Sequence, residues 1–119
     1  TTLFRSTAPQ ALRTQAFQRL LANLIDNALH HGSGTVEVAT TREGYCNVVE
    51  VLDRGPGIPS ADAARMLQPF TRLNSARSTS GTGLGLAIVD RIARLHGGQV
   101  QLLSREGGGL RARVELPLA

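Results

Sequence analysis

The stretch Val49-Glu50-Val51-Leu52-Asp53-Arg54-Gly55-Pro56-Gly57-Ile58 places an acidic residue where an apolar strand ends and a glycine-rich turn begins. Side chains alternate along a strand, so Val49, Val51 and Asp53 point to one face. The two valines put that face on the core, and the Asp53 carboxylate is therefore expected to face inward at the strand end. Because a buried carboxylate needs hydrogen-bond donors, this position predicts a specific partner.

Two kinds of partner would satisfy Asp53. The first is local, namely Arg54 or the amides of the turn that follows. The second is the exocyclic amine of a purine, which the carboxylate would accept while the glycines let the flat ring lie against bare backbone. The stretch taken alone is compatible with both.

A helix precedes this strand and is expected to end at Gly32. Its apolar residues recur at helical spacing and form one stripe, made of Phe17, Leu20, Leu21, Leu24, Ile25 and Ala28. Asn23 and Asn27 are four residues apart, so they share a face at the rim of that stripe. They are either ordinary solvated amides or, in the functional interpretation, Asn27 offers its oxygen to a hard cation such as Mg²⁺.

A second glycine run, Gly81-Thr82-Gly83-Leu84-Gly85-Leu86, opens another helix. Glycines let the backbone fold closely around phosphates, and a helix N-terminus supplies free N–H donors and the positive end of the dipole. The run is not a P-loop, since no Gly-Lys-Ser/Thr follows, and it is not a Rossmann fingerprint, since a long loop leads into it. A phosphate site here depends on the other motifs.

Alternation and turn signals predict the remaining elements. Strands are expected at residues 3–6, 35–41, 45–53, 99–104 and 110–116, with turns at 42–44 and 107–109. A short helix is expected over 61–67 with Ser60 as its N-cap, and a last helix over 84–96 with Leu84, Ile88, Ile92 and Leu95 inward. The fold class is therefore α/β (α+β): a two-layer sandwich of a mixed, mainly antiparallel sheet covered on one face by about three helices.

Composition sets the outer limits. The 119 residues suffice for one domain, and 41% of them are hydrophobic, enough for a real core. The net charge is +4 and every basic residue is Arg, but these arginines form no dense cluster and aromatic residues are scarce, so no nucleic-acid partner is expected. Cys46 is the sole cysteine, which excludes an internal disulfide. No apolar stretch is long enough to span a membrane.

Four motifs occur in order along the chain. They are Asn23-x-x-x-Asn27-Ala28, Asp53-Arg54-Gly55-Pro56-Gly57-Ile58, Gln68-Pro69-Phe70-x-Arg72 and Ser80-Gly81-Thr82-Gly83-Leu84-Gly85-Leu86-Ala87-Ile88. In this order they resemble the N, G1, F and G2 boxes of the catalytic, ATP-binding domain of sensor histidine kinases, whose Bergerat ATP-binding fold is shared with gyrase, Hsp90 and MutL. Two stretches, Phe70-x-Arg72-x-x-Ser75-Ala76-Arg77 and Ile88-Val89-x-Arg91-Ile92, are most similar to osmosensor kinases of the EnvZ type.

The resemblance implies a role for each matching residue. Asn27 would ligate Mg²⁺, with Asn23 near the metal or phosphates. Asp53 would read the adenine amine of ATP. The other nucleotide-binding positions it implies are Gly55, Gly57 and Ile58 under the base, His30 and His31 beside the nucleotide, Phe70 anchoring a lid over about residues 69–82, Gly81, Thr82, Gly83, Leu84, Gly85 and Leu86 around the phosphates, and Arg72 and Arg77 toward the terminal phosphate.

The resemblance also implies partners. A phosphoacceptor histidine would lie on a dimerisation domain of the same parent kinase, which is not expected in residues 1–119, because His30, His31 and His96 each end a helix and lack the acceptor context. The γ-phosphoryl group would pass to that histidine and then to a response regulator. The isolated domain is expected to be monomeric and to be a cytoplasmic domain of an inner-membrane sensor.

The sequence differs from the family pattern at two places, and two alternative functions are considered. Gyrase-like hydrolases carry a general-base Glu where Asn23 stands, and an amide cannot take a proton from water at neutral pH. Where the family often has Ser or Thr near the adenine, this chain has Leu110-Arg111. The rivals are a serine-directed anti-sigma kinase of the same fold and a pseudo-kinase that acts only by docking.

Overall fold

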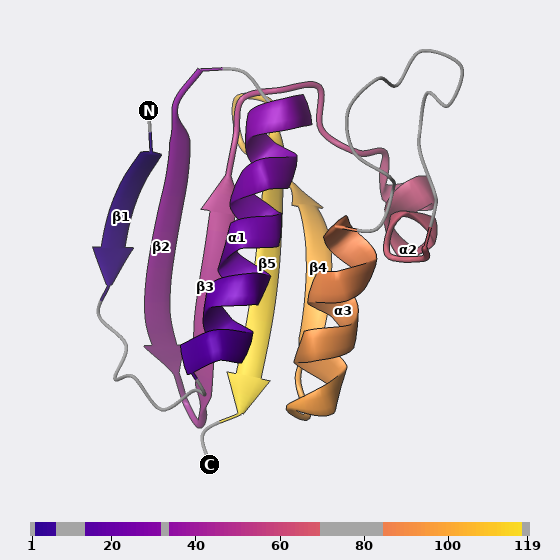
Figure 1. The fold of residues 1–119 in the computed structure, drawn as a ribbon. Helices are drawn as coiled ribbons and strands as arrows, with labels where there is room; N and C mark the ends of the chain where they lie inside the picture. The colour runs from indigo at the N-terminus through magenta and orange to yellow at the C-terminus, as the bar shows by residue number, and fades with distance from the viewer. Residues whose placement is uncertain (1, 7–13, 32–33, 70–84, 118–119) are drawn as a thin grey trace.

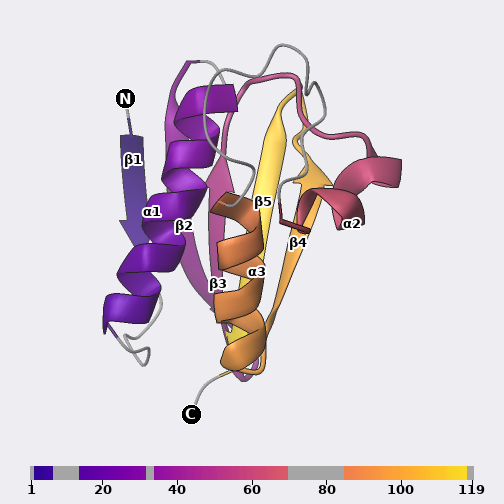
Figure 2. The same ribbon diagram turned by 45° about the vertical axis from the view of Figure 1, so that its right-hand side comes forward.

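The computed structural model describes residues 2–6, 14–31, 34–69 and 85–117. They form two layers, a β-sheet and a set of helices on one of its faces (Figure 1, Figure 2). The elements in chain order are β1 (Thr2–Ser6), α1 (Thr14–His31), β2 (Val36–Glu43), β3 (Cys46–Leu52), a 3₁₀ turn (Ser60–Asp62) leading into α2 (Ala63–Met66), α3 (Gly85–Leu95), β4 (Gln99–Ser104) and β5 (Leu110–Pro117). The predicted fold class is confirmed.

The sheet has five strands in the order β1-β2-β3-β5-β4. β1 is parallel to β2, and the other three pairings are antiparallel, so the sheet is mixed and mainly antiparallel as predicted. The last strand, β5, lies between β3 and β4, and the register sets Leu52 opposite Arg111. This insertion brings the β4–β5 hairpin next to the residues that follow β3.

The hydrophobic core fills the space between the sheet and α1 and α3, which pack beside each other. In α1 the predicted stripe is confirmed, because Leu20, Leu24 and Ala28 are buried and the other three residues of the stripe pack against them. The sheet contributes alternate residues, such as Ala112 and Val114 of β5. Burial of each large aliphatic side chain contributes on the order of 1.5–3 kcal/mol.

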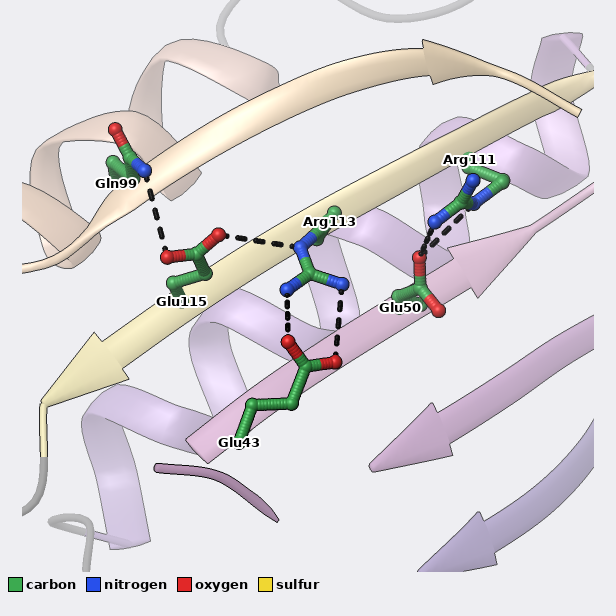
Figure 3. A network of polar contacts seen from close by, with 6 residues as sticks. All are labelled: Glu43, Glu50, Gln99, Arg111, Arg113 and Glu115. Carbon is green, nitrogen blue, oxygen red and sulfur yellow. Dashed lines mark hydrogen bonds and ion pairs between the residues drawn. The ribbon is translucent and has the colours of Figure 1, made fainter. Parts of the chain in front are cut away.

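The opposite face of the sheet carries charge. Arg111, Arg113 and Glu115 alternate with the buried residues of β5 and therefore point away from the helices. Arg113 grips Glu43 of β2 with Nη2–Oε1 and Nη1–Oε2 distances of 2.7 and 3.4 Å, and its Nε lies 3.3 Å from Glu115 (Figure 3). Hydrogen bonding first, and the charge of Arg113 second, lower the pKa of the Glu43 carboxyl. Arg111 donates from Nε and Nη2 to one oxygen of Glu50, Oε2, at 3.0 and 2.7 Å.

Two predictions about the ends of elements need correction. Strand β2 continues through Glu43, so the turn to β3 is at residues 44–45 rather than 42–44. The predicted N-cap role of Ser60 is wrong: Pro59 holds the cap position, no side chain caps the 3₁₀ turn, and the Asp62 amide bonds instead to the Pro59 carbonyl at 2.8 Å. The backbone turn already satisfies a donor that a cap would otherwise serve.

The inward face of α3 also differs from the prediction. Leu86, Val89 and Ala93 are buried, whereas Leu95 is 71% exposed. Ile88 and Ile92 are half-buried, and Ile92 packs against the core as predicted. Leu84 lies outside the described residues. Two apolar stripes overlap on this helix, and packing against α1 and the sheet selects the one spaced at 86, 89 and 93. Leu95, two residues after Ala93, points to a different side of the helix.

Candidate nucleotide-binding site

Asp53 lies at the end of β3, with its side chain directed into the protein. Only 3% of the residue is exposed, so the inward orientation predicted from the Val49-Val51-Asp53 alternation is confirmed. The Gly55 amide donates to Asp53 Oδ1 at 2.8 Å, which is the turn amide considered as a local partner. Oδ2 makes no hydrogen bond with any other described residue. The carboxylate therefore keeps one acceptor for a ligand.

The turn after Asp53 is shaped by close backbone contact. Gly57 has φ of +74°, and a β-carbon there would lie 3.0 Å from the Gly109 carbonyl oxygen. A side chain at Gly57 would be strained by its φ and crowded by the β4–β5 hairpin. Ile58 is half-buried and packs against the core, and Gly55 is half-buried beside the carboxylate. These residues present little side-chain bulk next to Asp53.

Helix α1 supplies both asparagines, which are half-buried as their rim position predicts. The Asn23 Nδ2 donates to the Arg19 carbonyl at 2.8 Å, one turn back on the same helix. Its Oδ1 faces the start of α3, where a β-carbon on Gly85 would lie 3.6 Å from it. The Asn27 side chain makes no hydrogen bond with another described residue. Its amide oxygen is thus available to a ligand.

The second glycine run is only partly described. Gly85 begins α3, as expected, and is half-buried beside Asn23. Leu86 is 5% exposed and belongs to the hydrophobic core, so its side chain packs inward. The other predicted residues of the lid and glycine run lie outside the described residues, namely Phe70, Arg72, Arg77, Gly81, Thr82, Gly83 and Leu84.

The two histidines that end α1 are exposed. The Nδ1 atom of His30 lies 2.8 Å from the Asp26 carbonyl oxygen, so this ring is tied to its own helix. His31 is the last residue of α1. Within the described part of the chain, no group of three His, Cys, Asp or Glu side chains is arranged to hold a metal ion.

The elements that carry these residues lie toward one end of the sheet. The end of β3, the C-terminal end of α1 and the β4–β5 hairpin lie at that end, and α3 begins lower along the sheet, beside Asn23 of α1 (Figure 1). The fold thereby gathers the first, second and fourth motifs, which lie far apart along the chain. A helix N-terminus, two amide oxygens and a buried carboxylate beside bare backbone suit a nucleotide, with its phosphates near α3 and its base near Asp53.

Sequence reasoning missed Arg105, which follows β4. Its Nη1 donates to the Asp53 carbonyl at 3.2 Å, and its Nη2 lies 3.0 Å from Glu37 Oε1 on β2. Arg54 reaches the same hairpin, donating to the Glu106 carbonyl at 2.7 Å. Contacts across 52 and 68 residues leave no local pattern in the sequence. The glycines at 107–109 signal the hairpin but not its neighbour.

Comparison with known proteins agrees with this geometry. The profile of the family described as histidine kinase-, DNA gyrase B- and HSP90-like ATPases matches residues 13–119. The chain belongs to this ATPase family.

Two similar proteins in the family are named sensor proteins. The chain is 42% identical to the sensor protein CutS of Streptomyces coelicolor over 85% of this chain and 26% of CutS. It is 41% identical to the sensor protein RstB of Escherichia coli over 91% of this chain and 25% of RstB. The chain thus spans about a quarter of the length of these curated relatives.

Solved structures show the same likeness. The NMR structure of the histidine kinase domain of the E. coli osmosensor EnvZ has a TM-score of 0.70 and 37% identity, covering 99% of this chain and 75% of that one. Full-length ShkA in complex with AMPPNP has a TM-score of 0.84 and 27% identity, covering 99% of this chain and 25% of ShkA. The chain is the ATP-binding catalytic domain of a two-component sensor histidine kinase.

Within the described residues, every helix is too short or too polar to cross a bilayer.

Proposed function

We propose that this domain binds Mg²⁺-ATP and donates the γ-phosphoryl group to a histidine on a separate dimerisation domain. The observation that carries the proposal is Asp53, a nearly fully buried carboxylate whose Oδ1 is held by the Gly55 amide and whose Oδ2 has no described partner. The adenine amine is a donor of the kind this oxygen lacks. Gly55, Gly57 and Ile58 would form the bed of the ring, because a flat base can approach backbone that carries little side-chain bulk.

The residues near the start of α3 fit the phosphates and their cation. Mg²⁺ prefers hard oxygen ligands and commonly takes only one or two from the protein, the rest coming from phosphates and water. Asn27 would supply one such oxygen, and Asn23 lies beside Gly85 at the helix N-terminus. When bound, the cation neutralises phosphate charge. The predicted roles of His30, His31, Leu86 and the lid residues Phe70, Arg72 and Arg77 remain part of this proposal.

Asn23 cannot act as a general base, so the site favours transfer of the phosphoryl group to a nucleophile on another domain over hydrolysis of ATP. An amide cannot deprotonate water, so the site suits positioning and charge neutralisation, which are the main demands of phosphoryl transfer. A histidine on the parent's dimerisation domain would be the nucleophile, and a response regulator would receive the phosphoryl group next. The 37% identity to the histidine kinase domain of EnvZ supports a histidine acceptor over a serine. A cytoplasmic location on an inner-membrane parent is also part of the proposal.

Calorimetric titration tests the nucleotide site. The chain should bind ATP more tightly with Mg²⁺ than without it. Asp53→Asn keeps an oxygen for the Gly55 amide but turns the free acceptor into a donor, so the affinity should fall by about 30-fold. Glu50→Gln, a neutralised carboxylate on the open face of the sheet, serves as the matched control and should bind as the parent does. Equal affinity of the Asp53→Asn and parent chains would contradict the assignment.

A phosphotransfer assay tests the acceptor. With radiolabelled γ-phosphate, the chain alone should neither label itself nor hydrolyse ATP quickly. It should label a separately prepared histidine-bearing helical fragment of its parent, and the label should be lost when that histidine is replaced by Gln. A stable phosphohistidine formed on the isolated chain would overturn the proposal of a separate acceptor.

A further inference from the structure

Arg105 links three parts of the sheet at the end where Asp53 lies. Its side chain is only 10% exposed. One nitrogen donates to the Asp53 main-chain carbonyl at 3.2 Å, and another bonds to Glu37 Oε1 at 3.0 Å. Its own backbone amide bonds to the Gly109 carbonyl at 3.1 Å, which closes the hairpin. One buried side chain therefore ties β2, the end of β3 and the β4–β5 hairpin together.

Other contacts attach the same hairpin to the residues around Asp53. The Asp53 amide bonds to the Leu110 carbonyl at 3.1 Å, so both polar groups of the Asp53 backbone are held by the hairpin segment. On the other side of that residue, Arg54 donates to the carbonyls of Glu106 and Gly108 at 2.7 and 3.2 Å. The main chain on both sides of the Asp53 carboxylate is anchored, and Arg105 also bonds to Glu37 of a third strand, β2.

We propose that Arg105 is a positioning residue for base recognition, acting through Asp53. This inference rests on the proposed function, in which the Asp53 carboxylate reads the adenine amine. A hydrogen bond weakens steeply with misalignment, so the direction of the carboxylate matters as much as its presence. The planar fork of Arg can serve two acceptors at once, and it remains charged at every physiological pH. The Arg105 guanidinium is held by Glu37 and bonds to the main-chain carbonyl of Asp53. It therefore fixes the position of the Asp53 backbone, from which the carboxylate extends.

The role differs from that of an ordinary surface ion pair. Arg111 offers the comparison, because it pairs with Glu50 at 2.7 Å on the same sheet but has no described contact with Asp53. Loss of either arginine removes one ion pair and one positive charge. Only the loss of Arg105 frees the Asp53 carbonyl. The pair Arg105→Gln and Arg111→Gln thus separates positioning from general stability.

The experiment measures purine discrimination by calorimetry in the presence of Mg²⁺. ATP is compared with ITP, whose base carries an oxygen in place of the amine. The ratio of the two Kd values reports on the base reader alone, because a general loss of stability weakens both nucleotides together. The Kd for ITP divided by the Kd for ATP should fall by about tenfold in Arg105→Gln, and it should be unchanged in Arg111→Gln. Arg105→Lys keeps the charge but not the fork, so it should restore the ratio in part.

A second measurement needs no nucleotide. The Gly55 amide bonds to the Asp53 carboxylate, so its proton exchange and its resonance report how well that side chain is held. In the free protein, both Arg105 variants should exchange this amide faster than the parent, whereas Arg111→Gln should not. This measurement covers the case in which Arg105→Gln fails to fold, because Arg105→Lys retains the ion pair with Glu37.

The outcomes separate the two proposals. If the parent prefers ATP and folded Arg105 variants discriminate as well as it does, Arg105 has no positioning role. A Gly55 amide that exchanges as in the parent would overturn it as well. If the parent itself shows no preference for ATP over ITP, base reading by Asp53 fails, and the inference about Arg105 fails with it.

Discussion

The α-carbon of Gly109 packs directly against the main-chain carbonyl of Asp53, so closely that a β-carbon there would collide with it. Gly109 also has φ of +115°, a conformation that side chains with a β-carbon rarely adopt. The hairpin therefore approaches the end of β3 through bare backbone. This contact joins two segments that are 56 residues apart in numbering and forms one wall of the proposed site.

Gly109→Ala should destabilise the domain and weaken ATP binding. Gly108→Ala is the matched control, because Gly108 has a similar φ of +106° but open space where a β-carbon would lie. Both changes introduce backbone strain of about 1–3 kcal/mol, and the collision at Gly109 should add about 1 kcal/mol or more. Chemical denaturation compares the two. Equal destabilisation would show that the hairpin relaxes away from Asp53 at little cost.

Asn27→Ala should remove the Mg²⁺ dependence of ATP binding and leave the fold intact, because the side chain is half-buried and has no described hydrogen bond to lose. Titrations with ATP in Mg²⁺ and in excess chelator check this. Asn27→Asp keeps an oxygen ligand and should retain a response to Mg²⁺. The assignment of the metal ligand fails if the alanine variant responds to Mg²⁺ as the parent does.

Asn47→Leu should raise the free energy of unfolding by about 1–2 kcal/mol. Asn47 is 3% exposed in β3, and neither its Oδ1 nor its Nδ2 has a hydrogen-bond partner within the described residues. A buried amide without partners carries a desolvation cost that leucine of similar size does not. Denaturant unfolding measures the gain. Asn47→Asp, which would bury a charge, should do the opposite; a leucine variant less stable than the parent would point to a partner for this amide.

Glu43→Gln should reduce stability at neutral pH and make no difference in acid. Arg113 lowers the pKa of Glu43 in the folded state, so the folded protein binds fewer protons than the unfolded chain as pH falls. The stabilisation is fully present above the unfolded pKa, about 4.3, and is lost as pH falls through the lower folded value. Melting temperatures of both proteins across pH 2–7 should therefore converge at the acid end. A constant difference across that range would contradict the linkage.

Much of the candidate site could be predicted from the sequence. The alternation of Val49, Val51 and Asp53 predicted a buried carboxylate, and the stripe along α1 placed Asn23 and Asn27 at the rim of the core. These predictions succeed because strand and helix periodicity are local properties of the chain. The inward face of α3 was predicted only in part, because Ile92 packs against the core whereas Leu95 is exposed. Two apolar stripes overlap on this helix, and only packing against other elements selects between them.

The sequence by itself determined the order of the motifs, the two periodicities and the family, since each depends on residues close together or on their succession along the chain. Only the tertiary structure decided which distant groups meet. The insertion of β5 between β3 and β4 carries the hairpin to Asp53, and it sets Arg105 between Asp53 and Glu37. The physical reason is that strand order and register arise from the burial of all the apolar faces together. The Asp53 carboxylate is thus a feature of the sequence, and the wall and anchor around it are features of the fold.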